Sequence, residues 1–250
     1  MAVALSSGAR PVDQQSRRQT SEGLMLNRLH CALPKRLMLA CAVALALTAC
    51  AGQVDPQIRK LPERVELNGV PFYRGYANQS GAMALAAMLS QQGVRVTPGL
   101  LDKPLNLPGG VANLQGSIEN VARDYGMVVY PLDHNLPALL TQVAAGYPVL
   151  LRYSEGVAFL GEPRYALLVG YDSYKQRVLL RSGMNRRMLM DFDSFTSAWA
   201  KEGSWAVLVQ KPNQLPAQVD RQRWLKAAHD LGQAGQEQAA AQATKAIDAK

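Results

Sequence analysis

A serine at the start of an uncharged segment is the side chain best placed to do chemistry in this sequence. The segment YANQSGAMALAAMLSQQG, residues 76–93, has no charged side chain, although the chain carries a formal charge of +8. Its small and apolar residues predict a helix over 80–93 that is buried on all sides and ends at Gly93. Ser80 then has two interpretations. It caps the helix, or it is a nucleophile at the positive end of the helix dipole.

A serine nucleophile requires a base, because its hydroxyl attacks only when its proton is removed. The chain has three histidines, and only His134 and His229 lie outside the N-terminal leader described below. His134 lies in a loop that precedes a predicted helix, and His229 lies near the C terminus. Arginine cannot act as the base, because its guanidinium stays protonated.

Arginines at the ends of predicted strands suggest a different chemistry. They are Arg152, Arg164, Arg181, Arg186 and Arg187. If they converge on one cleft, they can hold a carboxylate or a phosphate through paired hydrogen bonds. If they do not converge, they are solvated strand ends. We interpret the methionines as core residues and expect neither a metal ion nor a cofactor.

The elements that position these side chains are predicted to follow one another along the chain, with the helices first and the strands afterwards. Two more helices are predicted over 114–125 and 136–145, with Asn113 and Asn135 as their N-caps. Short apolar or alternating runs separated by turn residues predict strands over 127–132, 148–153, 165–171, 177–182, 186–192 and 205–210, with a short helix from Ser194 before the last strand. This order indicates an α+β fold with a largely antiparallel sheet.

Residues 1–49 are predicted to be an N-terminal extension followed by a signal peptide. The sequence KRLMLACAVALALTAC has a basic start and an apolar run that is too short to span a bilayer. Its ending, Leu47 to Cys50, resembles the lipobox of bacterial lipoproteins, and the alternative is a plain secretory signal. The resemblance implies cleavage before Cys50 and acylation of that residue, which gives stable membrane anchoring. Residues 50–64 then form the lipidated cysteine and a polar tether.

Cleavage at Cys50 would change the composition of the mature protein. Cys31 and Cys41 would leave with the leader, so no disulfide, cysteine metal site or thiol nucleophile would remain. The residues from Cys50 onward include 21 basic and 17 acidic side chains, a formal charge of +4. This mild charge gives no reason to expect a nucleic-acid partner.

The C-terminal part of the chain, residues 213–250, has a different composition. A proline-punctuated linker precedes two alanine-rich helical patterns, 221–231 and 236–249, which are joined at Gly232–Gly235. They look like one helical hairpin of the tetratricopeptide-repeat type. One such pair rarely buries enough surface to be stable alone, so we expect it to pack on the preceding domain or on a partner.

The order of motifs in residues 65–212 resembles a known family. VPFY (70–73) precedes the NQSGA helix start (78–82), and LPGG (107–110) precedes the next helix, with YALLVGYD (165–172) following. The order is similar to that of the papain-fold, double-glycine-leader (bacteriocin-processing) cysteine peptidase-like proteins and their lipoprotein relatives. The resemblance implies a papain-like fold in which a buried central helix packs against the sheet.

The resemblance also assigns a place to each catalytic residue of the family, and this sequence departs from the pattern at each one. The nucleophilic cysteine corresponds to Ser80, and the histidine that takes its proton corresponds to Arg164. The residue that orients the histidine corresponds to Ser182, which has no carboxylate. The oxyanion-stabilising glutamine corresponds to Arg74 or Gly75.

The sequence therefore predicts an inactive peptidase-like protein in which Ser80 is only an N-cap. We expect an outer-membrane lipoprotein that faces the periplasm of a Gram-negative bacterium, because Ala51 after the lipidated cysteine is not aspartate. Its expected role is to bind or scaffold a protein or peptide. The alternatives are a peptide hydrolase that uses Ser80, and a binder of an anionic ligand or peptidoglycan fragment through Arg152, Arg164, Arg181 and Arg187.

Overall fold

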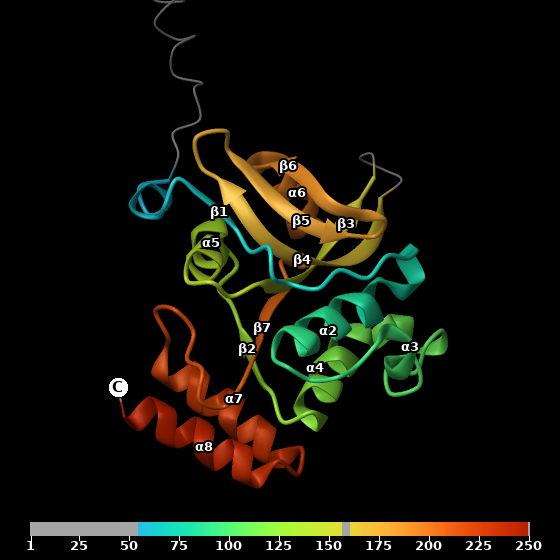
Figure 1. The fold of residues 1–250 in the computed structure, drawn as a ribbon, viewed down its shortest axis with the longest axis vertical. Coiled ribbons are helices and arrows are strands. Elements are labelled where there is room, and N and C mark those ends of the chain that lie inside the picture. Colours follow the sequence, from blue (N-terminus) through green and yellow to red (C-terminus); the bar gives the residue numbers. More distant parts are fainter. Residues whose placement is uncertain (1–54, 157–160, 250) are drawn as a thin grey trace, which may run out of the picture. The chain divides into compact units, whose positions relative to one another are not determined.

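A computed structural model of the chain describes residues 55–156 and 161–249 (Figure 1). The expected signal peptide and Cys50 lie outside the described residues. Among the described residues, no helix is both long enough and apolar enough to cross a membrane.

A buried helix, α2 (Ser80–Gln91), lies at the centre of the helical part of the fold. Every residue from Ser80 to Leu89 is buried, as predicted for a helix that is apolar on all sides. It packs against the strand β4 (Glu162–Asp172) and against the helices α3 (Pro98–Leu101) and α4 (Leu114–Asp124). Figure 1 shows α2, α3 and α4 gathered on one side of the sheet.

A seven-stranded sheet forms the second part of the fold, and each described strand pair in it is antiparallel. Its strand order is β2-β7-β3-β4-β5-β6, and β1 also pairs with β4. The strands are β1 (Arg64–Glu66), β2 (Val128–Pro131), β3 (Val149–Glu155), β4 (Glu162–Asp172), β5 (Arg177–Ser182), β6 (Asn185–Asp191) and β7 (Ala206–Gln210). The six strands predicted from the sequence are confirmed, and β1 was not predicted.

Helices cover both faces of the sheet, because alternate side chains of each strand point to opposite faces. On one face, Leu150, Leu167 and Val209 join the core that contains α2 and α4. On the other face, Leu151, Leu168 and Leu208 pack in the core that includes α5 (Leu136–Ala144) and α6 (Phe192–Lys201). These arrangements confirm an α+β fold.

The N-cap predictions for the two amphipathic helices have different outcomes. The Asn135 side chain accepts a hydrogen bond from the Ala138 amide and caps α5 as predicted. Asn113 precedes α4 but makes no side-chain capping hydrogen bond, because a 3-10 turn, η4 (Gly109–Asn113), leads directly into the helix. Asn113 therefore occupies the predicted N-cap position, but its side chain does not cap the helix.

The end of the expected tether packs on the domain. A short 3-10 helix, η2 (Ile58–Lys60), places Ile58 in the same core as α5 and α6. Strand β1 follows and pairs with residues 170–172 of β4. The packed structure therefore extends N-terminal to residue 65, where the domain was expected to begin.

The C-terminal helices α7 (Arg221–Gln233) and α8 (Glu237–Asp248) form the predicted hairpin and pack on the domain. Trp224 is fully buried, and its indole Nε1 donates to the carbonyl of Ala243 at 2.8 Å. The Trp224 ring also lies 6.2 Å from the ring of Tyr130 on β2. The side-chain amide of Gln142 exchanges two hydrogen bonds with the backbone of Ala217, in the linker. Figure 1 shows the hairpin beside β2.

Candidate functional site: the start of the central helix

The Ser80 hydroxyl is bound to backbone groups on both sides. Its Oγ donates to the carbonyl of Ala77 at 2.7 Å and accepts a hydrogen bond from the amide of Tyr165 at 3.2 Å. Ser80 is 2% exposed. The described residues include no histidine, lysine or carboxylate that hydrogen-bonds to this hydroxyl.

The interpretation of Ser80 as an N-cap is wrong. Gln79 occupies the N-cap position, and Ser80 is the first residue of α2. The reason is a 3-10 turn, η3 (Ala77–Gln79), that runs directly into the helix, so Ser80 already has helical backbone angles. Its hydroxyl therefore joins α2 to β4 instead of binding the first amides of its own helix.

Arg164 lies on β4 directly before Tyr165 and forms an ion pair with Glu155 of β3. A second carboxylate, that of Glu162, lies 3.8 Å from Arg164 Nη2. The pairing register explains these contacts, since Tyr153 lies opposite Arg164 and Glu155 lies opposite Glu162. A cation with a carboxylate partner thus occupies this part of the site.

Gly75 contacts the turn between β5 and β6. Its amide donates to the carbonyl of Gly183 at 3.3 Å. A Cβ placed on Gly75 would lie 2.5 Å from Met83 Sδ and 3.0 Å from Gln79 Oε1. The Met83 and Gln79 side chains therefore fill the space that a side chain at position 75 would need.

Ser182 lies at the end of β5, and its side chain is bound to a tyrosine. The Tyr153 hydroxyl donates to Ser182 Oγ at 2.9 Å, and both residues are buried. Burial raises the pKa of the Tyr153 hydroxyl, so the tyrosine stays neutral. The Ser182 hydroxyl is thus committed to this buried hydrogen bond, on the face of the sheet that Tyr153 occupies.

The backbones at the four positions singled out from the sequence come close together, but the Ser182 side chain lies on the face of the sheet opposite to α2. Ser80 binds the residue that follows Arg164, and Arg164 Nη1 lies 3.3 Å from the place a Cβ would take on Gly183. Gly183 follows Ser182 and binds Gly75. The start of α2, the start of β4 and the β5–β6 turn thus meet at one place.

The structure is similar to solved peptidase structures. It matches a C39-like peptidase from Bacillus anthracis with a TM-score of 0.50 and 18% identity, over 60% of this chain and 98% of the other. The fold is papain-like. Two further matches are the peptidase domain of Streptococcus ComA, a bifunctional ABC transporter involved in quorum sensing (TM-score 0.42, 15% identity, 56% and 97% coverage), and xylellain, a cysteine protease from Xylella fastidiosa (0.45, 11%, 63% and 90%). No family model and no curated protein matches the sequence.

Two side chains at this site of the papain-like fold were missed by sequence reasoning. Glu155 supplies a carboxylate beside Arg164, whereas the resemblance points to a position near Ser182. Gln79 places a side-chain amide against Gly75, whereas the resemblance points to an amide five or six residues before Ser80. Pairing 148–155 with 162–168 as a hairpin would have placed Glu155 near Arg164. The amide position depends on a side-chain conformation that no local pattern specifies.

The arginines expected to line one cleft have separate partners. Arg152 pairs with Glu202 at 3.0 Å, and Arg187 binds both carboxylate oxygens of Glu66 at 2.9 and 2.8 Å. Arg181 and Arg187 line different pockets. Neither Arg181 nor Arg186 has a carboxylate partner among the described residues, and Arg181 differs from Arg186 because it is buried.

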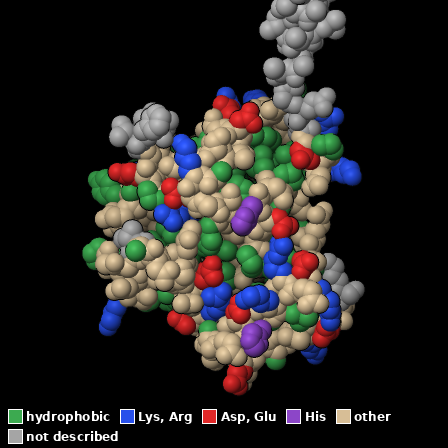
Figure 2. Space-filling view, turned by 180° about the vertical axis from the view of Figure 1, so that it is seen from behind, with side chains coloured by type: hydrophobic (Ala, Val, Ile, Leu, Met, Phe, Trp, Pro, Cys, Tyr) green, Lys and Arg blue, Asp and Glu red, His purple; other side chains and the backbone are tan. Residues whose placement is uncertain are grey.

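The described residues contain no group of three side chains suited to hold a metal ion. His134 and His229 are both exposed, on the loop before α5 and on α7. Figure 2 shows basic and acidic side chains intermixed over the face opposite to that of Figure 1.

Proposed function

We propose that this protein is a lipid-anchored periplasmic protein of the outer membrane, in which a papain-like domain has lost peptidase activity and binds a protein or peptide partner. The observation that carries the loss of activity is the bonding of Ser80. Its only hydroxyl hydrogen goes to the carbonyl of Ala77, which cannot act as a base. The anchor is inferred from the sequence around Cys50.

Arg164 adds to the case against catalysis. A serine attacks a carbonyl only if a neighbouring base accepts its proton, and a guanidinium does not release its own proton at any ordinary pH. Glu155 neutralises the charge of Arg164, and the same ion pair holds the Glu155 carboxylate in place. The carboxylate of Glu155 is therefore committed to an ion pair.

Exposed apolar side chains beside the site support a binding role. Tyr76 is 76% exposed, and Met184 is 59% exposed. They follow Gly75 and Gly183, whose hydrogen bond joins the two loops. Tyrosine and methionine are both enriched in protein interfaces, so the surface formed by Tyr76 and Met184 fits a protein or peptide partner.

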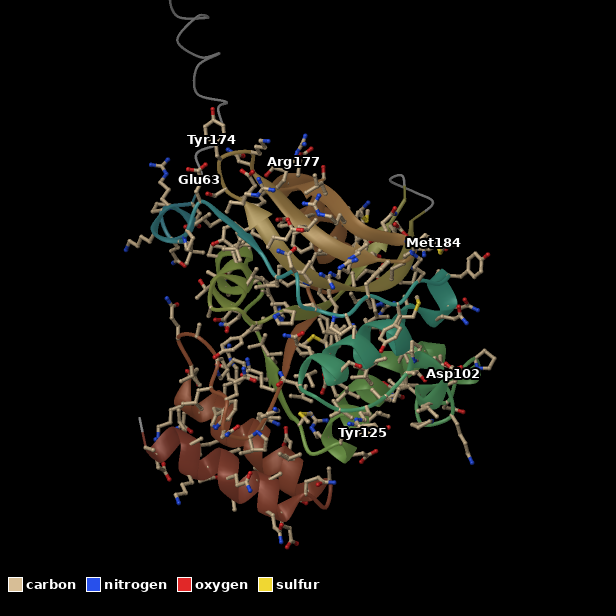
Figure 3. All side chains as sticks on the ribbon, viewed as in Figure 1. Glu63, Asp102, Tyr125, Tyr174, Arg177 and Met184 are labelled. Atoms are coloured by element: carbon tan, nitrogen blue, oxygen red, sulfur yellow. The ribbon has the colours of Figure 1, made fainter. Side chains whose placement is uncertain are left out.

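A photo-crosslinking experiment in intact cells tests the binding role. Tyr76 is replaced by p-benzoylphenylalanine in the full chain, and Tyr174 serves as the matched control because it is an equally exposed tyrosine, at 81%. Tyr174 and Met184 lie at opposite ends of β5 (Figure 3).

We expect a discrete, protease-sensitive adduct from position 76 and none from position 174. Adducts of the same size and yield from both positions, or no adduct from position 76, would contradict a partner at this surface.

A further inference from the structure

Arg181 is a buried cation whose hydrogen bonds are incomplete. It is 7% exposed, and its Nη2 donates to the carbonyls of Leu67 and Asn68 at 3.1 and 3.2 Å. Its Nε and Nη1 are buried and have no partner among the described residues. A buried guanidinium with unused donors is costly, because hydrogen bonds from the protein do not replace all of its lost hydration.

The surroundings of Arg181 leave its charge uncompensated. Burial, and then repulsion from Arg186, lower the pKa of the Arg181 guanidinium from its ordinary value. Glu66 attracts it from a distance, but the carboxylate of Glu66 is bound at both oxygens by Arg187. The local charge therefore favours an anion.

Arg181 lines a small pocket between α2 and the sheet, next to Gly183 of the candidate site. Its other walls are mainly apolar and include Phe72, Met83 and Leu167. The pocket has a volume of about 20 Å³, which is enough for one water molecule. It is therefore closed to larger ligands in this conformation.

Tyr73 and Met83 separate this pocket from a larger one. The second pocket, of about 180 Å³, is lined by the same two side chains together with Arg74, Gln79 and Asp102, among others. The Tyr73 hydroxyl is hydrogen-bonded and fixed in place. Met83 has a flexible thioether side chain, so its rotation is the simplest way to join the two pockets.

We propose that Arg181 is an anion subsite, in this pocket beside the candidate site, that receives a carboxylate of a bound peptide, with Met83 moving aside to admit it. The carboxylate belongs to the C terminus of the peptide or to an acidic side chain. The apolar walls hold the adjoining aliphatic part, and the unused donors of Arg181 bind the oxygens. This inference rests on the proposed peptide-binding role and names the chemistry recognised there.

Three probe peptides test the subsite by calorimetric titration of the full-length protein. Acetyl-Ala-Leu with a free carboxylate presents a C terminus, and acetyl-Ala-Glu-amide presents an acidic side chain. Acetyl-Ala-Leu-amide is the neutral control. We expect at least one of the acidic peptides to bind about tenfold or more tightly than the neutral one. The peptide that binds identifies the source of the carboxylate.

Variants assign the effect to the guanidinium. Arg181→Gln is expected to remove the preference for the acidic peptide, and Arg181→Lys to retain part of it because the charge remains. Arg152→Gln is the matched control, since Arg152 already has a carboxylate partner in Glu202, and it is expected to bind as the parent does. Thermal melting of each variant shows whether it is folded. If Arg181→Gln is unfolded, the comparison of Arg181→Lys with the parent decides.

Equal binding of the acidic and neutral peptides would overturn the subsite, as would a preference that survives in Arg181→Gln. The absence of binding by all three peptides would also overturn it. These outcomes are distinct from a failure of the proposed function, because the cross-linking at Tyr76 detects a partner whether or not Arg181 contributes to binding.

Discussion

The hydroxyl of Ser80 and the backbone amide of Tyr165 are joined by a 3.2 Å hydrogen bond that connects the central helix to the longest strand. This bond uses a lone pair of the hydroxyl oxygen, and the bond to Ala77 uses its hydrogen. The group at the start of the helix therefore has a structural role that local sequence does not reveal.

Replacing Ser80 by alanine tests that structural role. We expect the free energy of unfolding to fall by about 1–3 kcal/mol, because a buried amide loses its partner. Urea denaturation measures the change. Thr244→Ala is the control, since the Thr244 hydroxyl binds only a carbonyl of its own helix at an exposed position. Its effect should stay within about 0.5 kcal/mol. Equal stability of Ser80→Ala and the parent would show that the hydroxyl is dispensable.

Gly75→Ala tests the close packing of Met83. The added methyl would lie 2.5 Å from Met83 Sδ, so we expect a loss of about 1–3 kcal/mol. Most of this loss should disappear when Met83→Ala is combined with it, which denaturation of the four proteins in a double-mutant cycle measures. Gly99→Ala meets no atom within 4 Å and should be neutral. Additive effects of Gly75→Ala and Met83→Ala would contradict the contact.

Trp224→Ala tests how strongly the stability of the α7–α8 hairpin depends on the buried Trp224 indole. The indole is fully buried and hydrogen-bonded to Ala243, so we expect the unfolding free energy to fall by about 3–5 kcal/mol. His229→Ala, at an exposed position of the same helix, is the control and should have little effect. Denaturation followed by circular dichroism measures both. A loss below about 1 kcal/mol in Trp224→Ala would mean that the hairpin is held in another way.

Cys50→Ser tests the proposed anchor. Cells grown with a palmitate analogue should label the parent protein and the Cys41→Ser control, but not Cys50→Ser. The unlabelled variant should persist as a precursor or appear in the soluble fraction. Label that remains on Cys50→Ser would disprove lipidation at this residue.

The helices and strands could be predicted because their apolar periodicity is local. The central helix is buried on all sides, as its composition indicated. Strand β1 was missed because Arg64–Glu66 is only three residues long, too short for its alternation to indicate a strand, and it is defined by its pairing with residues 170–172 of β4. Short segments of this kind depend on tertiary contacts.

The site was predicted less well, because its contacts join residues that are far apart in sequence. Ser80 has the residue type of an N-cap, but its partner Tyr165 is 85 positions away. Glu155 lies beyond the predicted end of its strand, and the strand register places it beside Arg164. The sequence singled out Ser80 and Arg164 without revealing their bonding, and it did not single out Glu155.

An activity assay of the purified full-length protein tests the central claim, that the papain-like domain is catalytically inactive. The parent and Ser80→Ala are incubated with a mixture of fluorogenic peptides and with a fluorophosphonate probe, which labels activated serines. We predict no turnover above that of Ser80→Ala and no probe on Ser80, because the hydroxyl hydrogen is held by Ala77 and Arg164 cannot accept a proton. Peptide hydrolysis by the parent that is lost in Ser80→Ala would contradict the account.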